Sequence, residues 1–175
     1  LWAVLTIATA ATVLIVSLVD YNPLINLVWF AIPVIGLPAN LLMARKEGVG
    51  KGFKTAIDVI SDGIWCTVGV VAILLSLICL AFNIAGYPQA WLAMFYFAFI
   101  VVGFGAAMQG IVLKESSYVF GGLFSILAGF VVVVLSLCNI PLLMVWVIPL
   151  YILCFLLMFI VPAFIIRKKF NAAGR

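Results

Sequence analysis

Six long apolar stretches divide the chain, and they constrain its fold more than any other feature. They are Leu1–Val19, Leu24–Ala44, Gly63–Asn83, Gln89–Leu113, Tyr118–Cys138 and Leu142–Ile166. A helix of about 20 apolar residues crosses the hydrocarbon core of a bilayer. The stretches are apolar on all sides, whereas a strand of a membrane barrel alternates between polar and apolar residues. The sequence therefore predicts an all-α, polytopic integral membrane protein with six transmembrane helices.

The composition supports this class and excludes others. Hydrophobic residues make up 69% of the 175 residues and charged residues 8%, against about 45–50% and about 25% in a soluble domain. The connecting segments are too short to fold separately, so we expect a single transmembrane domain over residues 1–175 whose main partner is the lipid bilayer, with no binding of nucleic acid. The chain has no histidine, the commonest general base and metal ligand, and we expect no cofactor and no metal.

The positions of the basic residues predict the orientation of the helices. Every lysine and arginine follows the second, fourth or sixth stretch: Arg45, Lys46, Lys51, Lys54, Lys114, Arg167, Lys168, Lys169 and Arg175. Cytoplasmic loops carry an excess of such residues. Both termini are therefore predicted to be cytoplasmic, and the short outer turns favour a bacterial inner membrane.

The outer turns are short and alike, which predicts three antiparallel helical hairpins. Each turn contains an Asn and a Pro, both common in turns: Asp20–Pro23, Asn83–Pro88 and Asn139–Pro141. A serine precedes each turn, and a tryptophan follows it: Ser17, Ser76, Ser136, Trp29, Trp91 and Trp146. These matches suggest a repeated hairpin. A shared choice of turn residues and interfacial tryptophans would give the same pattern.

Residues 51–62, which precede the third stretch, are predicted to form an amphipathic interfacial helix. Phe53, Ala56, Ile57 and Ile60 fall on one face at helical spacing. Such a segment lies in the plane of the membrane surface.

Asp58 and Asp62 are the only closely paired carboxylates. Four residues apart on a helix, they could hold a divalent cation together with Glu47 or Glu115. CDP-alcohol phosphotransferases also have six helices and use aspartates at a membrane face, but their Asp-Gly-x-x-Ala-Arg core is missing, because residues 62–66 read Asp-Gly-Ile-Trp-Cys. Acidic residues at a helix start are favoured by the helix dipole, so we predict no catalytic residue and no enzyme activity.

The second stretch contains the first candidate binding residues. Pro33 and Pro38 flank Gly36, and Asn40 follows. Prolines inside a helix free backbone carbonyls and distort it. Broken helices in mid-membrane bind substrate in many transporters, although neighbouring side chains can also fill such kinks.

Two further amides complete the candidate site. Asn26 lies in the second stretch, and Gln109 lies among small residues of the fourth. A buried amide needs a partner, which is either a ligand or a polar group on another helix. We expect any pocket beside the second helix, near Asn40 and Gln109.

The small residues and the cysteines indicate how the helices pack rather than a reactive site. Gly121, Ser125 and Gly129 recur every fourth residue, a spacing that lets helices approach closely. This seam is expected to be internal, although it could also join two copies of the chain. The four cysteines include no CxxC pair and are expected mainly as buried small residues.

Two functions remain compatible with the sequence. The helix cores contain no Asp, Glu, Lys, Arg or His, which argues against proton-coupled transport and voltage sensing. The first function is binding, or facilitated passage, of a small neutral or apolar solute between the second, fourth and sixth helices. The length and helix number resemble those of vitamin-binding S components of bacterial transporters, a likeness of fold alone. The alternative is a non-catalytic membrane subunit, acting through a partner protein or a homo-oligomer.

Overall fold

A computed structural model describes residues 1–19, 23–46, 55–87, 90, 92–142 and 144–173. Within these residues all regular structure is helical and no strand occurs. The elements are α1 (Trp2–Val19), η1 (Pro23–Phe30), α2 (Ala31–Lys46), α3 (Ala56–Ile84), α4 (Leu92–Tyr96), η3 (Phe97–Val101), α5 (Val102–Leu113), α6 (Ser116–Leu137), α7 (Met144–Phe155), η4 (Leu156–Ile160) and α8 (Val161–Ala173).

Five helices among the described residues are long and apolar enough to cross a membrane. They are Trp2–Val19, Ala56–Ile84, Leu92–Leu113, Ser116–Leu137 and Val145–Ala172. This arrangement is compatible with a polytopic membrane protein, as the sequence predicted.

The second apolar stretch does not form the single α-helix that we expected over residues 24–44. A 3₁₀ helix, η1, covers Pro23–Phe30, and the α-helix α2 begins only at Ala31. Pro33 lies in the first turn of α2, where its missing N–H is not needed. Because α2 begins only two residues before Pro33, this proline does not interrupt the α-helix. Pro38 is then the one proline inside α2.

The third helix begins at Ala56 rather than at Gly63. Thr55 and Asp58 form a capping box at its start: the Asp58 N–H donates to Thr55 Oγ1 over 3.2 Å, and the Thr55 N–H donates to Asp58 Oδ2 over 3.0 Å. Such reciprocal bonds satisfy the free N–H groups of a first turn. Residues 56–62 of the expected interfacial segment are therefore the first turns of α3, and residues 51–54 lie outside the described residues.

The fourth and sixth helices each contain a five-residue π turn. In the fourth, η3 (Phe97–Val101) joins α4 to α5, and in the sixth, η4 (Leu156–Ile160) joins α7 to α8. Each turn ends with an N–H that bonds five residues back, from Val102 to Phe97 and from Val161 to Leu156. Both turns pack against α6.

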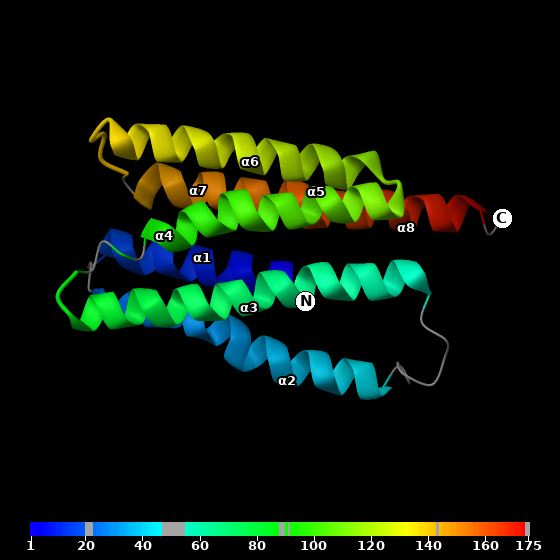
Figure 1. Cartoon of the computed structure of the whole chain (residues 1–175), viewed down its shortest axis with the longest axis horizontal. Coiled ribbons are helices and arrows are strands. Elements are labelled where there is room, and N and C mark those ends of the chain that lie inside the picture. Colours follow the sequence, from blue (N-terminus) through cyan, green and yellow to red (C-terminus); the bar gives the residue numbers. More distant parts are fainter. Residues whose placement is uncertain (20–22, 47–54, 88–89, 91, 143, 174–175) are drawn as a thin grey trace.

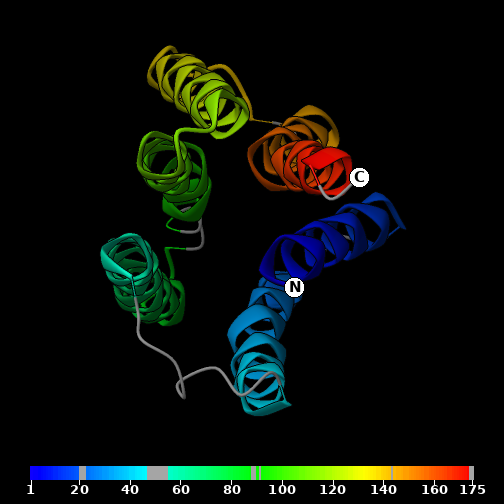
Figure 2. The same cartoon turned by 90° about the vertical axis from the view of Figure 1, so that its right-hand side faces the viewer.

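The helices follow one another around an open arc (Figure 2). Helix α1 packs on α2 and on α7, α7 packs on α6, α6 on α5, and α5 on α3. Helices α2 and α3 lie at the two ends of this arc. They move apart from each other toward the side of the molecule where the C-terminus lies (Figure 1).

Glycines allow α5 and α6 to pack closely against each other. A Cβ atom built on Gly122 would come within 2.5 Å of the Gly103 carbonyl oxygen, and one built on Gly110 within 2.6 Å of the Val119 nitrogen. A Cβ atom on Gly129 would meet that of Phe99 at 2.8 Å. Gly110 and Gly122 thus allow backbone contact between α5 and α6, whereas Gly121 and Gly129 of the predicted seam lie against Leu157 in η4 and Phe99 in η3, so the seam is internal.

Candidate functional site

Aromatic rings fill the junction of the second, fourth and sixth predicted spans. Trp29 comes from η1, Phe95 from α4 and Tyr151 from α7. The ring centroid of Tyr151 lies 5.7 Å from that of Trp29 and 5.8 Å from that of Phe95, and those of Trp29 and Phe95 lie 6.3 Å apart. All three pairs are edge-to-face, a favourable arrangement of aromatic rings. We call these residues the aromatic junction.

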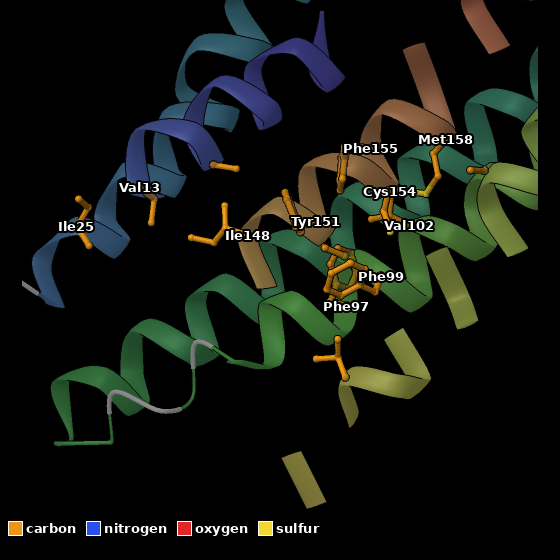
Figure 3. Packing of buried hydrophobic residues seen from close by; sticks show 14 residues of the cluster. Val13, Ile25, Phe97, Phe99, Val102, Ile148, Tyr151, Cys154, Phe155 and Met158 are labelled. Atoms are coloured by element: carbon orange, nitrogen blue, oxygen red, sulfur yellow. The ribbon is translucent and has the colours of Figure 1, made fainter. Parts of the chain in front are cut away.

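A line of rings continues from the aromatic junction along the sixth helix (Figure 3). Tyr151 stacks on Phe155 with centroids 4.6 Å apart and meets the edge of Phe99 at 5.9 Å. Phe155 contacts Phe159 at 5.6 Å, and Phe159 contacts Trp65 of α3 at 5.5 Å. The region in which we expected a solute cavity therefore contains side chains of the three helices that were to line it.

Gln109 is buried, as a binding residue would be, but it has a protein partner. Its Oε1 atom accepts a hydrogen bond of 2.8 Å from the Ser61 hydroxyl. Ser61 lies in α3 and Gln109 in α5, so the bond joins two helices. This is the interhelical role that the sequence left open as an alternative to ligand binding.

The candidate residues of the second stretch do not converge with Gln109. Asn40 and Pro38 are exposed and Pro33 is half-buried, in a helix that packs on α1 and η1. Asn26 lies in η1, and its side chain is outside the described part of the structure.

The expected break around Gly36 is occupied by a side chain of the protein itself. A Cβ atom built on Gly36 would fall 2.3 Å from a carbon of the Trp2 ring. The glycine therefore makes room for an indole of α1, and a ligand at this position would have to displace it.

Two of the carboxylates, Asp58 and Glu115, have structural roles at helix ends. Asp58 belongs to the capping box of α3, and Glu115, at the turn between α5 and α6, forms an ion pair with Lys169 of α8. Within the described residues no three of the His, Cys, Asp and Glu side chains group as a metal site would require. All four cysteines are free. Cys79 and Cys154 are buried, whereas Cys66 and Cys138 are exposed.

Two polar contacts between helices were not singled out from the sequence. The buried Ser125 hydroxyl of α6 donates to the Phe99 carbonyl of η3 over 2.9 Å, and the Tyr96 hydroxyl donates to Ser136 over 2.7 Å. Ser125 was visible as a small residue of the seam. Its acceptor was not, because Phe99 lies in a π turn that the residues of that segment do not predict.

Comparison of the chain with family models, curated proteins and solved structures gives no match. The candidate site thus rests on the geometry of this chain alone.

Proposed function

We propose that the chain is a non-catalytic membrane subunit that acts by binding another membrane protein along α3. The observation that carries this proposal is the small share of α3 that the rest of the chain covers. Only 6% of the apolar window of this 29-residue helix is buried, compared with 56% for Leu92–Leu113.

Small residues also occur where the rest of the chain leaves α3 uncovered, although Gly63 and Gly69, six residues apart, lie on different sides of the helix. Gly63 and Gly69 would each accept a Cβ atom with nothing within 4 Å, whereas Gly103, Gly110, Gly121, Gly122 and Gly129 all meet a neighbouring helix. Cys66 and Thr67 are also exposed on α3. Small residues permit close helix contact, which drives association where lipid removes the hydrophobic driving force.

The side-chain packing in the interior of the helix bundle also supports a role as a membrane subunit. The aromatic junction fills the meeting point of the three helices, and the amide of Gln109 is bonded to Ser61. A solute pocket needs several convergent polar groups in a concave site. The geometry of the described residues therefore favours the subunit over the solute binder.

Substitution of the two open glycines tests this proposal. Gly63→Leu and Gly69→Leu together should leave the isolated protein folded, because a Cβ atom at either position meets nothing within 4 Å. We expect the double variant to lose the partner that co-purifies with a tagged wild-type chain from its own membrane. Ala8→Leu, a similar enlargement on an exposed position of α1, is the matched control and should retain it. Equal retention by all three proteins would refute binding along α3.

Binding of a small apolar solute is the second candidate, favoured by the aromatic junction. Aromatic side chains are the usual lining of apolar ligand sites. A solute that enters there would quench the fluorescence of Trp29, and Trp29→Phe would remove that signal. Absence of any quenching by apolar solutes would leave the junction as packing alone.

We further propose a placement in a bacterial inner membrane with both termini in the cytoplasm. The cytoplasmic termini follow from the basic residues, all of which come after the second, fourth or sixth span. The short outer turns favour a bacterial inner membrane. The repeated hairpin remains a prediction from the serines and tryptophans at the turns, and six spans require that η1 and α2 cross the membrane together.

A further inference from the structure

The net charge of the chain is confined to its second half. Residues 1–88 contain four acidic and four basic residues, whereas residues 89–175 contain five basic residues and one acidic residue, Glu115. The formal charge of +4 therefore belongs entirely to the region from α4 onward.

The fold gathers this charge at one end of the molecule. Helix α5 ends at Leu113, its C-cap Lys114 has the left-handed backbone conformation at φ 55°, and α6 starts after Glu115. The resulting turn is held by the Glu115 N–H, which donates to the Gly110 carbonyl over 2.8 Å. This tight turn and the last turns of α8 lie at the same end of the bundle (Figure 1).

An ion pair joins the two basic segments directly. Lys169 of α8 contacts Glu115, which is largely covered, with 17% of its side chain exposed. The pair neutralises the one carboxylate of this half. Lys114, which precedes Glu115 in the chain, and Arg167 and Lys168, which precede Lys169, are all exposed. We call Lys114, Arg167, Lys168 and Lys169 the basic patch.

The basic patch lies where a membrane-spanning helix leaves the hydrocarbon. The apolar span Val145–Ala172 has 28 residues, about 42 Å of helix against a hydrocarbon core of about 30 Å. Phe164 and Phe170, on either side of Arg167–Lys169, are 66% and 74% exposed. Cations interleaved with exposed aromatic rings at such a position fit the boundary between headgroups and acyl chains.

We propose that the basic patch is a binding site for the phosphate of an anionic phospholipid. Lys114, from the α5–α6 turn, and Arg167 and Lys168, from α8, supply the cations, and the Glu115–Lys169 pair holds the two segments together. Arginine and lysine are the side chains that bind phosphate groups most strongly. A basic residue near an anionic membrane surface contributes about 1 kcal/mol, or roughly fivefold in binding.

Native mass spectrometry of the delipidated protein with defined lipids tests the site. The wild-type chain should retain phosphatidylglycerol in preference to phosphatidylcholine. The triple variant Lys114→Gln, Arg167→Gln and Lys168→Gln should lose that preference, by about fivefold for each cation removed. All three side chains are exposed, so the variant should unfold thermally like the wild type. Single substitutions should give the same loss in smaller steps.

The control has the same change of charge in the neutral half of the chain. Lys46→Gln, Lys51→Gln and Lys54→Gln together should leave the lipid preference intact. An equal loss in this control would overturn the proposal, because it would show attraction by diffuse charge. Displacement of phosphatidylglycerol by excess inorganic phosphate would also overturn it, since the site would then bind a soluble anion rather than a lipid.

Discussion

Gly121 of α6 lies directly against the backbone carbonyl of Leu157 in the π turn η4. A Cβ atom built on Gly121 would come within 2.3 Å of the Leu157 oxygen and 2.8 Å of its carbonyl carbon. In the register of the π turn, the next donor to this carbonyl would be the N–H of residue 162, and Pro162 has none. Gly121 therefore lets the backbone of α6 contact the sixth helix at the point where that helix lacks one backbone hydrogen bond.

We predict that Gly121→Ala destabilises the protein by about 1–3 kcal/mol, because the methyl group must displace backbone atoms. Reversible unfolding by SDS in mixed micelles measures this change. Gly63→Ala is the matched control, as its Cβ atom meets nothing within 4 Å. The control should be neutral or stabilising by up to about 1 kcal/mol, since alanine is the better helix former. Equal destabilisation by the two substitutions would contradict the contact with Leu157.

Ser125→Ala should cost about 1 kcal/mol of stability, because it removes the buried bond to the Phe99 carbonyl. The control is Ser76→Ala. The Ser76 hydroxyl donates over 2.8 Å to Ala72 within its own helix, and that carbonyl has its helical partner in any case. The same unfolding assay should show a smaller effect for Ser76. A larger loss at Ser76 than at Ser125 would show that the π turn does not depend on the hydroxyl.

The bond between Ser61 and Gln109 should appear as a coupling energy in a double-mutant cycle. Ser61→Ala, Gln109→Leu and the double variant are compared by their free energies of unfolding. Hydrogen bonds between membrane helices average about 0.6 kcal/mol of coupling, and we expect at least this value. Strictly additive effects would mean that the two side chains act independently and that Gln109 is available for a ligand.

Much of the helix pattern was predictable from the sequence. The first and fifth spans were expected at Leu1–Val19 and Tyr118–Cys138 and are found at Trp2–Val19 and Ser116–Leu137. Hydrophobicity and the need to satisfy the backbone inside a bilayer determine such segments almost alone. The start of α3 at Ala56 was not predicted, since the third helix was expected to begin at Gly63, although the capping box of Thr55 and Asp58 is a local interaction.

The parts that the sequence did not reveal depend on contacts between helices. The π turn at Phe97–Val101 contains no proline and no glycine, and nothing in its own residues distinguishes it from α-helix. It lies against the small residues of α6, which is a property of the packed molecule. In the same way, the composition around Gln109 predicted a need for a partner but could not identify Ser61, which lies 48 residues away.

The orientation of the helices can be measured by labelling of introduced cysteines. In a chain whose native cysteines are replaced, Ile140→Cys should react with an impermeant maleimide added to intact cells, because it lies in the exposed turn between α6 and α7. Asn171→Cys, near the end of α8, should react only after the cells are opened. The reverse pattern would overturn the cytoplasmic placement of the basic residues.

The central claim, that this chain works as a subunit bound along α3, is tested most directly by native mass spectrometry of the protein released gently from its own membrane. We predict a mass that contains this chain together with another chain or a second copy, and we predict that Gly63→Leu with Gly69→Leu reduces it to the monomer. A wild-type monomer that carries only a small non-lipid molecule would contradict the claim and would support the solute binder instead.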